Sequence, residues 1–273
     1  MTTSANAKPH PDIGTELVRE WSPNGTARAT IVLVHGLAEH SGRYEKTGLL
    51  LAEAGFAVRS FDLMGAGGSG GRRWHVEKWS LYHDQVQSHV TWALDQGRPV
   101  ILMGHSIGGA IALGYLLDEA RPRPDLAVLS APALAGGEGW QKSIIPLLGR
   151  ALPTLAIPNP VKGEHLSRDP RVAEAYFGDP LVEPKATLGF GAEALAELER
   201  LNDELGKLSI PTLVIHGGED RLVPTWCSEE LGNVACVDRT VYEGLRHETL
   251  NEPEGPEVVA DIVSWLDTKL ADL

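Results

Sequence analysis

The sequence predicts one α/β domain built around a mostly parallel sheet, and three observations support this. First, short runs of β-branched and other apolar residues, such as Ala29–His35 and Leu126–Ser130, are typical of strands buried on both faces. Second, helix-like stretches alternate with these runs, as in βαβ units. Third, a chain of 273 residues with 42% hydrophobic and 22% charged residues is long enough to bury one large core.

The predicted elements follow a flexible N-terminus, which we expect at residues 1–14 because this stretch lacks a buried pattern. A loop rich in glycine or proline separates many of the elements that come after it. In chain order, the elements are a strand at Ala29–His35, a helix near Glu45–Gly55, a strand at Phe56–Phe61, a helix at Trp79–Gln96, a strand at Val100–Met103, a helix ending near Asp118, strands at Leu126–Ser130, Pro211–His216 and Arg239–Tyr242, and a helix at Glu257–Leu270.

The alternation of strands and helices stops between residues 133 and 206. Apolar clusters occur here at Ile144–Leu148 and Leu152–Ile157, but prolines interrupt them, so short, kinked helices are expected. We therefore assign residues 15–132 and 207–273 to the core domain. Residues 133–206 are predicted to form a helical cap inserted between two strands of the sheet.

Net charge and composition indicate which binding partners and which cellular location to expect. The formal net charge of −13 repels polyanions, so nucleic acid is not expected to bind. The sequence has no apolar leader and no stretch of membrane-spanning length, which predicts a cytoplasmic protein. Cys227 and Cys236 are expected to be separate thiols, with a disulfide between them as the less favoured alternative.

The most informative motif is the GxSxG pentapeptide Gly104–Gly108. A predicted strand precedes it and a predicted helix follows it, which is the context of a nucleophile on a sharp strand-to-helix turn. Such a turn needs glycines because side chains there would crowd the neighbouring backbone. Ser106 is therefore the candidate nucleophile.

A serine nucleophile needs a histidine base and a carboxylate that orients the histidine. Asp220 and His247 each follow a predicted strand, and the order Ser, Asp, His is that of α/β-hydrolases. Glu219 is the rival acid, and His216 is interpreted as a structural histidine at the end of a strand. Taken separately, Asp220 fits a turn aspartate and His247 a surface histidine, but their order and placement favour a triad.

The tetrahedral intermediate of ester hydrolysis needs preorganised N–H donors. One comes from the residue after the nucleophile and one from the loop after an earlier strand, which predicts the backbone N–H groups of Ile107 and Leu37. No cofactor is expected. A metal site at His35 and His40 is not favoured, since neither HExxH nor CxxC is present.

Several segments of the chain resemble the monoacylglycerol lipase family. The segment His35–Tyr44 reads HGLAEHSGRY and is similar to the HGxGEHSGRY segment of that family. The similarity extends over nearly the whole chain, through Gly104–Gly109, Leu129–Pro132, Ser167–Pro170, Asp179–Val182, His216–Pro224 and His247–Glu254. The departures are Ala38 where glycine is usual, Ile107 where methionine is common, and a changed loop at Asp62–Ser69.

The resemblance implies an α/β-hydrolase fold and cleavage of the single acyl ester of a monoacylglycerol. It implies Ser106, Asp220 and His247 as the triad. It also implies an apolar cap that makes transient contact with membranes or micelles, and hence peripheral membrane association. The candidate cap residues for the substrate pocket are apolar and are Ile144, Ile145, Leu148, Leu152 and Leu155.

The segment His35–Tyr44 also contains several polar residues whose role can be predicted. We expect Glu39 and Arg43, together with His40 and Ser41, to form a polar network that holds Leu37 in place, in preference to contacting substrate. We also expect His35 and Gly36 to help support this loop.

Two alternatives to a monoacylglycerol lipase stay open at this point. One is a lysophospholipase or a general short-chain carboxylesterase. The other, from a different class, is a non-catalytic ligand-binding protein on a hydrolase-like fold.

Overall fold

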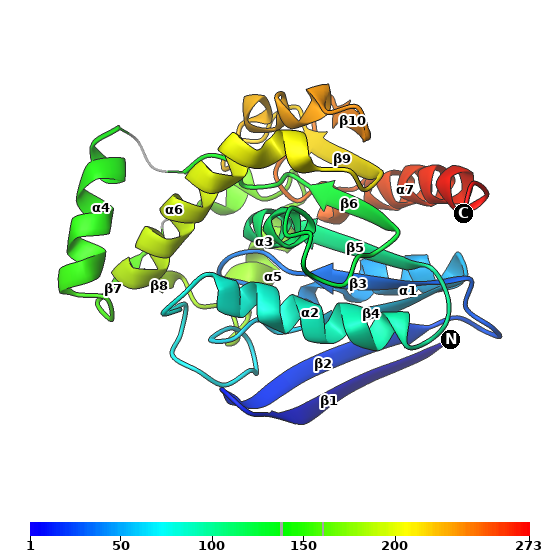
Figure 1. Ribbon diagram of the computed structural model, residues 1–273, viewed down its shortest axis with the longest axis horizontal. Coiled ribbons are helices and arrows are strands. Elements are labelled where there is room, and N and C mark those ends of the chain that lie inside the picture. Colours follow the sequence, from blue (N-terminus) through cyan, green and yellow to red (C-terminus); the bar gives the residue numbers. More distant parts are fainter. Residues whose placement is uncertain (137–138, 160) are drawn as a thin grey trace.

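The computed structural model describes residues 1–136, 139–159 and 161–273, and within them an eight-stranded sheet forms the centre of the molecule (Figure 1). The strands lie in the order β1-β2-β4-β3-β5-β6-β9-β10, and all neighbours from β4 to β10 are parallel. Their bounds are β1 Thr2–His10, β2 Gly14–Ser22, β3 Ala29–Val34, β4 Phe56–Phe61, β5 Val100–His105, β6 Leu126–Ser130, β9 Thr212–Gly217 and β10 Val237–Tyr242. This confirms the predicted mostly parallel α/β fold.

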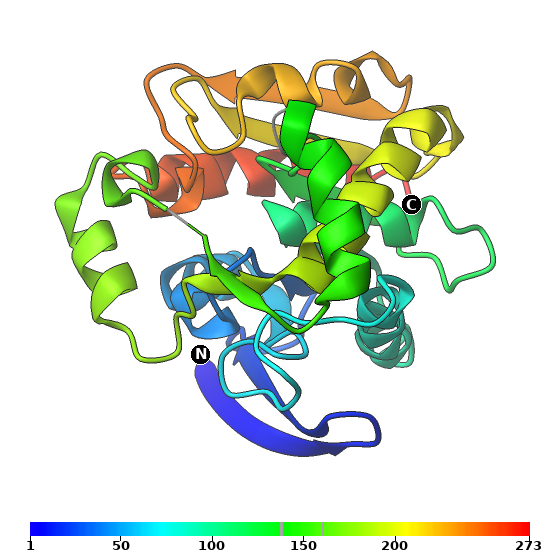
Figure 2. The same ribbon diagram turned by 90° about the vertical axis from the view of Figure 1, so that its left-hand side faces the viewer.

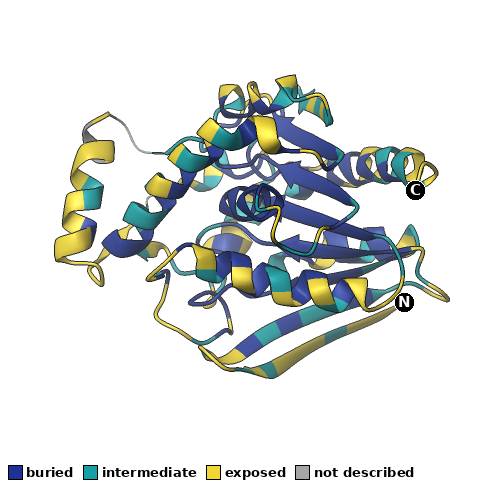
Figure 3. Cartoon of the chain, in the orientation of Figure 1, coloured by how far each residue is buried: buried dark blue, intermediate teal, exposed yellow. Residues whose placement is uncertain are grey.

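Helices cover both faces of the sheet because alternate strand residues point to opposite sides. Val32 and Val34 of β3 belong to one apolar cluster with α2 (Ser80–Leu94) and α3 (Ile107–Leu116). Ile31 and Leu33 belong to the other, with α1 (Glu45–Glu53) and α7 (Gly255–Leu270). Figure 3 shows the central strands almost entirely buried, which explains their continuous apolar runs.

The N-terminal stretch differs from the prediction. Residues 2–10 form β1, which pairs antiparallel with β2 from Thr2 opposite Ser22 to His10 opposite Gly14. Strand β2 itself, not predicted from the sequence, pairs antiparallel with β4. The expected flexible N-terminus at residues 1–14 is thus wrong, because the edge of the sheet supplies hydrogen-bond partners to a polar segment that has few apolar side chains of its own.

The insertion, which we define as the described residues between 133 and 206, lies between β6 and β9. It projects beyond the carboxyl ends of the parallel strands, and two of its helices, α4 and α5, lie well apart (Figures 1 and 2). Its elements are α4 Gly139–Ala151, β7 Ala156–Pro158, η2 Gly163–His165, α5 Pro170–Gly178, β8 Lys185–Thr187 and α6 Leu188–Glu204. Pro146 lies inside α4, as expected for an interrupted helix, whereas α6 is long at 17 residues.

In a sheet of this kind, the loops that bear functional residues lie at the carboxyl ends of the parallel strands. His35 follows β3, Ser106 follows β5, Asp220 comes shortly after β9 and His247 follows β10. Residues far apart in the sequence therefore meet at one edge of the sheet.

Candidate active site

Ser106 occupies a strained turn between β5 and α3. Its backbone has φ 55° and ψ −121°, in the left-handed region that L-residues rarely adopt. A Cβ at Gly104 would lie 2.4 Å from the carbonyl oxygen of Gly108, and a Cβ at Gly108 would lie 2.3 Å from that of His35. Both glycines are therefore required by close backbone approach. Ser106 is half-buried among buried neighbours, so its side chain stays accessible at the edge of the sheet.

Asp220 and His247 form a hydrogen-bonded pair. The Nδ1–H of His247 donates to Oδ2 of Asp220 at 2.7 Å, which leaves Nε2 of the histidine available as a base. The other carboxylate oxygen of Asp220 accepts from the backbone N–H groups of Leu222 at 2.8 Å and Val223 at 2.9 Å. Burial raises the pKa of Asp220, but hydrogen bonds from His216 and His247 outweigh it and hold the pKa well below its ordinary value.

The rival residues are His216 and Glu219, and Nε2 of His216 also lies 3.3 Å from Oδ2 of Asp220. His216 is fully buried, its Nδ1 lies 2.9 Å from the hydroxyl of Ser228, and its Nε2 lies 2.7 Å from the carbonyl oxygen of Val223. Glu219 is exposed. The geometry therefore pairs His247 with Asp220 and gives His216 a structural position.

His105 brings the base close to the nucleophile turn. Its ring lies 4.8 Å from the ring of His247, centroid to centroid, and it directly precedes Ser106. Burial and the neighbouring His247 lower the pKa of His105 to about 4, so this imidazole is neutral at neutral pH. Its Nδ1 lies 3.1 Å from the hydroxyl of Ser130.

The loop after β3 passes beside Ser106. A Cβ at Gly36 would lie 3.4 Å from Cβ of Ser106, so the backbone just before Leu37 passes close to the nucleophile. Ala38 has φ 66°, a conformation that favours glycine and that explains why its position is unusual for alanine. In the part of the chain that the structure describes, the N–H groups of Leu37 and Ile107 have no hydrogen-bond acceptor. They are thus available to a ligand.

Glu39 fixes this loop from inside. Its Oε1 accepts from the N–H of Gly36 and from the hydroxyl of Tyr44, both at 2.6 Å, and its Oε2 accepts from Arg43 at 2.7 Å. Burial alone would raise the pKa of Glu39, but Arg43 and the nearby histidines lower it to about 2. The carboxylate is therefore charged and fully used as an acceptor.

The two histidines of the loop also have hydrogen-bond partners. Nδ1 of His35 lies 2.8 Å from the carbonyl oxygen of Gly36, and its Nε2 accepts from the N–H of Leu63 at 2.9 Å. Nδ1 of His40 accepts from the N–H of Gly42, and its Nε2 lies 2.9 Å from Oδ2 of Asp179 in the insertion. These bonds engage the nitrogens that a metal ion would need.

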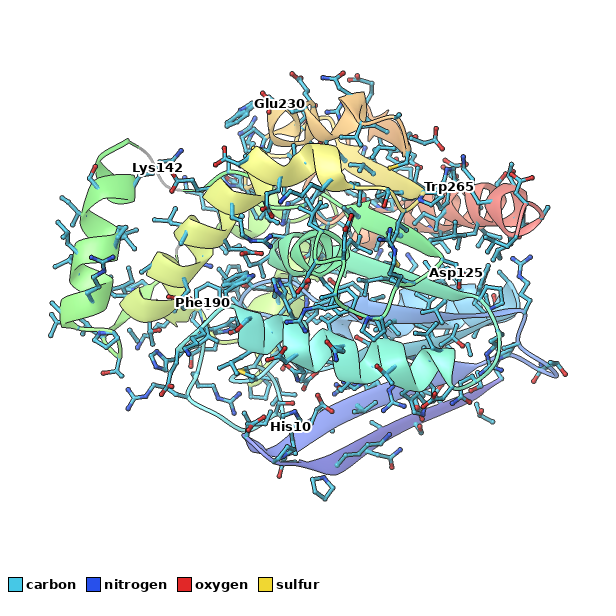
Figure 4. The ribbon with its side chains drawn as sticks, in the orientation of Figure 1. His10, Asp125, Lys142, Phe190, Glu230 and Trp265 are labelled. Atoms are coloured by element: carbon cyan, nitrogen blue, oxygen red, sulfur yellow. The ribbon has the colours of Figure 1, made fainter. Side chains whose placement is uncertain are left out.

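A cavity of about 1120 Å³ lies between α4 and α6. Lys142 on α4 and Glu230 on the loop above α6 border it on two sides (Figure 4). None of Ser106, Asp220 and His247 lines it, but Cys227, which comes soon after Asp220, does. Both cysteines are free thiols, so the disulfide alternative is excluded.

The structure does not place the predicted pocket residues of the insertion in this cavity. Its α4 lining consists of residues on the face turned toward α6, such as Pro146 and Gly149. Of the five candidates, Ile145 packs toward Gly191 of α6, while the other four are exposed, namely Ile144, Leu148, Leu152 and Leu155. Within α4, the helical period turns Ile144 and Leu148 away from α6, whereas Leu152 and Leu155 lie after the end of the helix.

The comparisons with known proteins agree with this geometry. The profile of the family described as "Serine aminopeptidase, S33" matches residues 25–254. A monoacylglycerol lipase of Mycolicibacterium smegmatis is 34% identical over 266 residues, covering 92% of this chain and 92% of the relative. The chain belongs to this family of serine hydrolases. The monoacylglycerol lipase resemblance, the α/β-hydrolase fold and the enzyme class predicted from the sequence are thereby confirmed.

Two further proteins have identities to this chain that are close to that of the mycobacterial enzyme, and a third shares its fold. The human monoglyceride lipase is 32% identical over 266 residues, covering 93% of this chain and 87% of the relative. The crystal structure of a monoacylglycerol lipase from Paleococcus ferrophilus superposes with a TM-score of 0.84 at 31% identity, covering 92% of this chain and 98% of that one. The yeast monoglyceride lipase, at 19% identity and a TM-score of 0.87, shares the fold.

Proposed function

We propose that this serine hydrolase cleaves the acyl ester of monoacylglycerols to a fatty acid and glycerol. The observation that carries the proposal is the Asp220–His247 hydrogen bond beside the strained turn of Ser106. The relatives named monoacylglycerol lipase support the choice of substrate, since they cover nearly the whole length of this chain.

The reaction proceeds by acyl transfer in two halves. Nε2 of His247 takes the proton of the Ser106 hydroxyl as the oxygen attacks the ester carbonyl carbon, and Asp220 stabilises the resulting imidazolium. The N–H groups of Leu37 and Ile107 donate to the oxyanion of the tetrahedral intermediate. The intermediate collapses, His247 returns the proton to the leaving glycerol oxygen, and an acyl-enzyme remains.

Water completes the reaction at the same groups. His247 takes a proton from the water, whose oxygen attacks the acyl carbon, and the same two N–H groups hold the second oxyanion. The Ser106 oxygen leaves with a proton from His247, and the fatty acid is released.

The insertion serves as a cap that admits a lipid substrate. Several large apolar residues on α4 and the segment after it are exposed, namely Ile144, Leu147, Leu148, Leu152, Leu155 and Ile157. A patch of this kind on a protein surface marks a contact with an apolar partner. We assign it to transient docking on membranes or micelles, where monoacylglycerols reside. No helix among the described residues has the length and hydropathy to cross a membrane.

Hydrolysis of a substrate series tests the proposal. We expect long-chain monoacylglycerols to be cleaved with higher kcat/KM than lysophosphatidylcholine or p-nitrophenyl butyrate. A much higher kcat/KM for lysophosphatidylcholine would contradict the proposal and indicate a lysophospholipase. A higher kcat/KM for p-nitrophenyl butyrate would indicate a general carboxylesterase.

Replacement of the nucleophile tests the assigned chemistry. Ser106→Ala is expected to lower kcat by roughly 10⁴-fold or more, because the acyl-enzyme can no longer form. The same variant should lose labelling by a fluorophosphonate probe. Labelling that persists in Ser106→Ala would refute the assignment of the nucleophile. A wild-type protein that neither labels nor turns over would favour a non-catalytic binding protein.

A further inference from the structure

A buried arginine connects the two loops on which the proposed chemistry depends. Arg43, in η1 (Ser41–Tyr44), holds Glu248 with two hydrogen bonds, from Nη1 to Oε1 at 2.7 Å and from Nη2 to Oε2 at 2.8 Å. The same Nη1 donates to Glu39 at 2.7 Å. The side chains of Arg43, Glu39 and Glu248 are 9%, 5% and 6% exposed. Parallel charged hydrogen bonds of this kind fix orientation as well as distance.

The ends of this bridge adjoin the reacting groups. On one side, Glu248 follows His247 in the chain. On the other, Glu39 accepts from the N–H of Gly36 at 2.6 Å, and Gly36 precedes Leu37. Every link from the N–H of Leu37 to the imidazole of His247 is therefore a covalent bond or a short hydrogen bond.

Further contacts hold the bridge itself in place. Glu248 accepts from the side-chain amide of Asn251 at 2.9 Å, and its backbone N–H donates to the carbonyl oxygen of Leu166 at 2.8 Å. The guanidinium of Arg43 lies 4.9 Å from the ring centroid of Tyr176. Because polar groups on several segments are satisfied at once, the cluster has one favoured arrangement.

We propose that Arg43 and Glu248 are positioning residues that keep the oxyanion loop and the loop of His247 in one fixed relation. The proposal rests on the proposed function, in which Leu37 and His247 act on the same substrate in the same step. An error in their relative position lowers the rate of that step, while the apolar contacts that bind the ester change little. Neither residue is required to touch the substrate.

The competing explanation is that the bridge only stabilises the fold, and the chain offers a matched control. Arg59 of β4 forms an ion pair with Glu20 of β2 at 2.8 Å, and the two side chains are 6% and 30% exposed. Its guanidinium also lies 3.9 Å from the ring centroid of Trp92, as that of Arg43 lies over Tyr176. Arg59 belongs to none of the loops at the proposed site.

The test compares Arg43→Met, Glu248→Gln, the double variant and Arg59→Met. We would measure kcat and KM for p-nitrophenyl butyrate, the rate of fluorophosphonate labelling of Ser106, and the thermal midpoint. Each bridge variant should lower kcat and the labelling rate by roughly 10- to 100-fold, with KM changed by less than about threefold. Arg59→Met should lower the thermal midpoint and leave kcat unchanged.

Two further variants make the result specific. The double variant should be no slower than the slower single variant, since both substitutions break one bridge. Arg43→Lys keeps the charge but not the two parallel bonds, so its kcat should lie between those of wild type and Arg43→Met. If Arg43→Met does not fold, Glu248→Gln and Arg43→Lys carry the test, because both retain the size of the native side chain more closely.

Several results would overturn the proposal. These are a folded bridge variant with wild-type kcat, losses that multiply in the double variant, or an equal loss of kcat in Arg59→Met. Failure of the proposed function is a separate result. A wild-type enzyme that cleaves p-nitrophenyl butyrate but not monoacylglycerols rejects the substrate while the bridge proposal stands. A wild-type protein whose Ser106 neither turns over nor labels rejects both.

Discussion

The two arms of the insertion differ sharply in how they meet the rest of the molecule. Residues 161–184, which we call the inner arm, bond directly to the loops of the candidate site. The carbonyl oxygens of His165 and Leu166 accept from the N–H groups of His247 at 3.4 Å and Glu248 at 2.8 Å, and the N–H of Glu183 donates to Ala38 at 3.1 Å. Helix α4 packs mainly on α6 and, together with the segment after it up to residue 157, exposes apolar residues. We call residues 139–157 the outer arm.

This difference separates two tasks within one insertion. The inner arm buries Tyr176 against Ala38 and Leu166, so it forms part of the wall that fixes the oxyanion loop. The outer arm leaves Leu147 66% exposed, and among the described elements α4 packs mainly on α6. Segments with few buried contacts open at low free-energy cost, whereas well-packed ones open only with the domain. We therefore expect motion and lipid contact in α4 and rigidity in the inner arm.

The largest effect is expected from loss of the buried inner-arm anchor. Tyr176→Ala removes an aromatic side chain that is 2% exposed and packs with Ala38, and should lower the free energy of unfolding by about 3 kcal/mol or more. It should also lower kcat, because the oxyanion loop loses one wall. Denaturant unfolding and steady-state kinetics measure the two effects. Tyr176→Phe is the control and should retain both the free energy of unfolding and kcat of the wild type. Equal stability of Tyr176→Ala and wild type would contradict the expectation that the inner arm is the rigid one.

A smaller effect concerns the acid stability of the loop that the inner arm covers. The pKa of Glu39 is lowered to about 2 in the folded protein, from 4.5, so its contribution to stability is present above about pH 4.5 and is lost as the pH falls toward 2. Glu39→Gln should therefore reduce the slope of unfolding free energy against pH between about 5 and 2. Urea unfolding across this range provides the measurement, and an unchanged slope would show that folding does not lower the pKa of Glu39.

The smallest effect on stability is expected in the outer arm. Replacing Leu147, Leu148 and Leu152 with serine should change the free energy of unfolding by less than about 0.5 kcal/mol per site, because these side chains are exposed. Binding to lipid vesicles and hydrolysis of emulsified long-chain monoacylglycerol should fall, while kcat for p-nitrophenyl butyrate stays unchanged. Sedimentation with vesicles and parallel assays decide this. Equal loss on both substrates would place α4 in the rigid part of the site.

The contrast between the arms also explains which predictions the sequence supported. The strands at Phe56–Phe61 and Leu126–Ser130 agree residue for residue with β4 and β6, because central strands carry their burial in their own composition. The turn at Ser106 was predictable since its glycines respond to contacts within the motif and with the adjacent strand. In contrast, the facing of the α4 side chains depends on α6, about 40 residues further on, and local apolar clusters carried no sign of it.

Two other features lay outside the reach of sequence patterns. The polar segment at residues 2–10 becomes β1 only because β2 offers it an edge, and those hydrogen bonds belong to the tertiary fold. Glu248 lies beside His247 in a segment that resembles the family, yet its partner Arg43 is 205 residues away. The sequence indicated only that Glu248 follows the candidate base His247. Short-range patterns in the sequence could not predict that its partner is Arg43.

The sequence by itself determined the chemistry that we propose for this protein: a candidate nucleophile on a glycine turn, a candidate acid and base in the order of α/β-hydrolases, and an insertion rich in apolar residues. These are set by residue type and short-range spacing. Only the tertiary structure decided which carboxylate meets His247, which face of α4 is exposed, and that Arg43 joins the two loops. Such choices depend on backbone paths that bring distant residues together, and a buried charge is stabilised only where the fold supplies its partner.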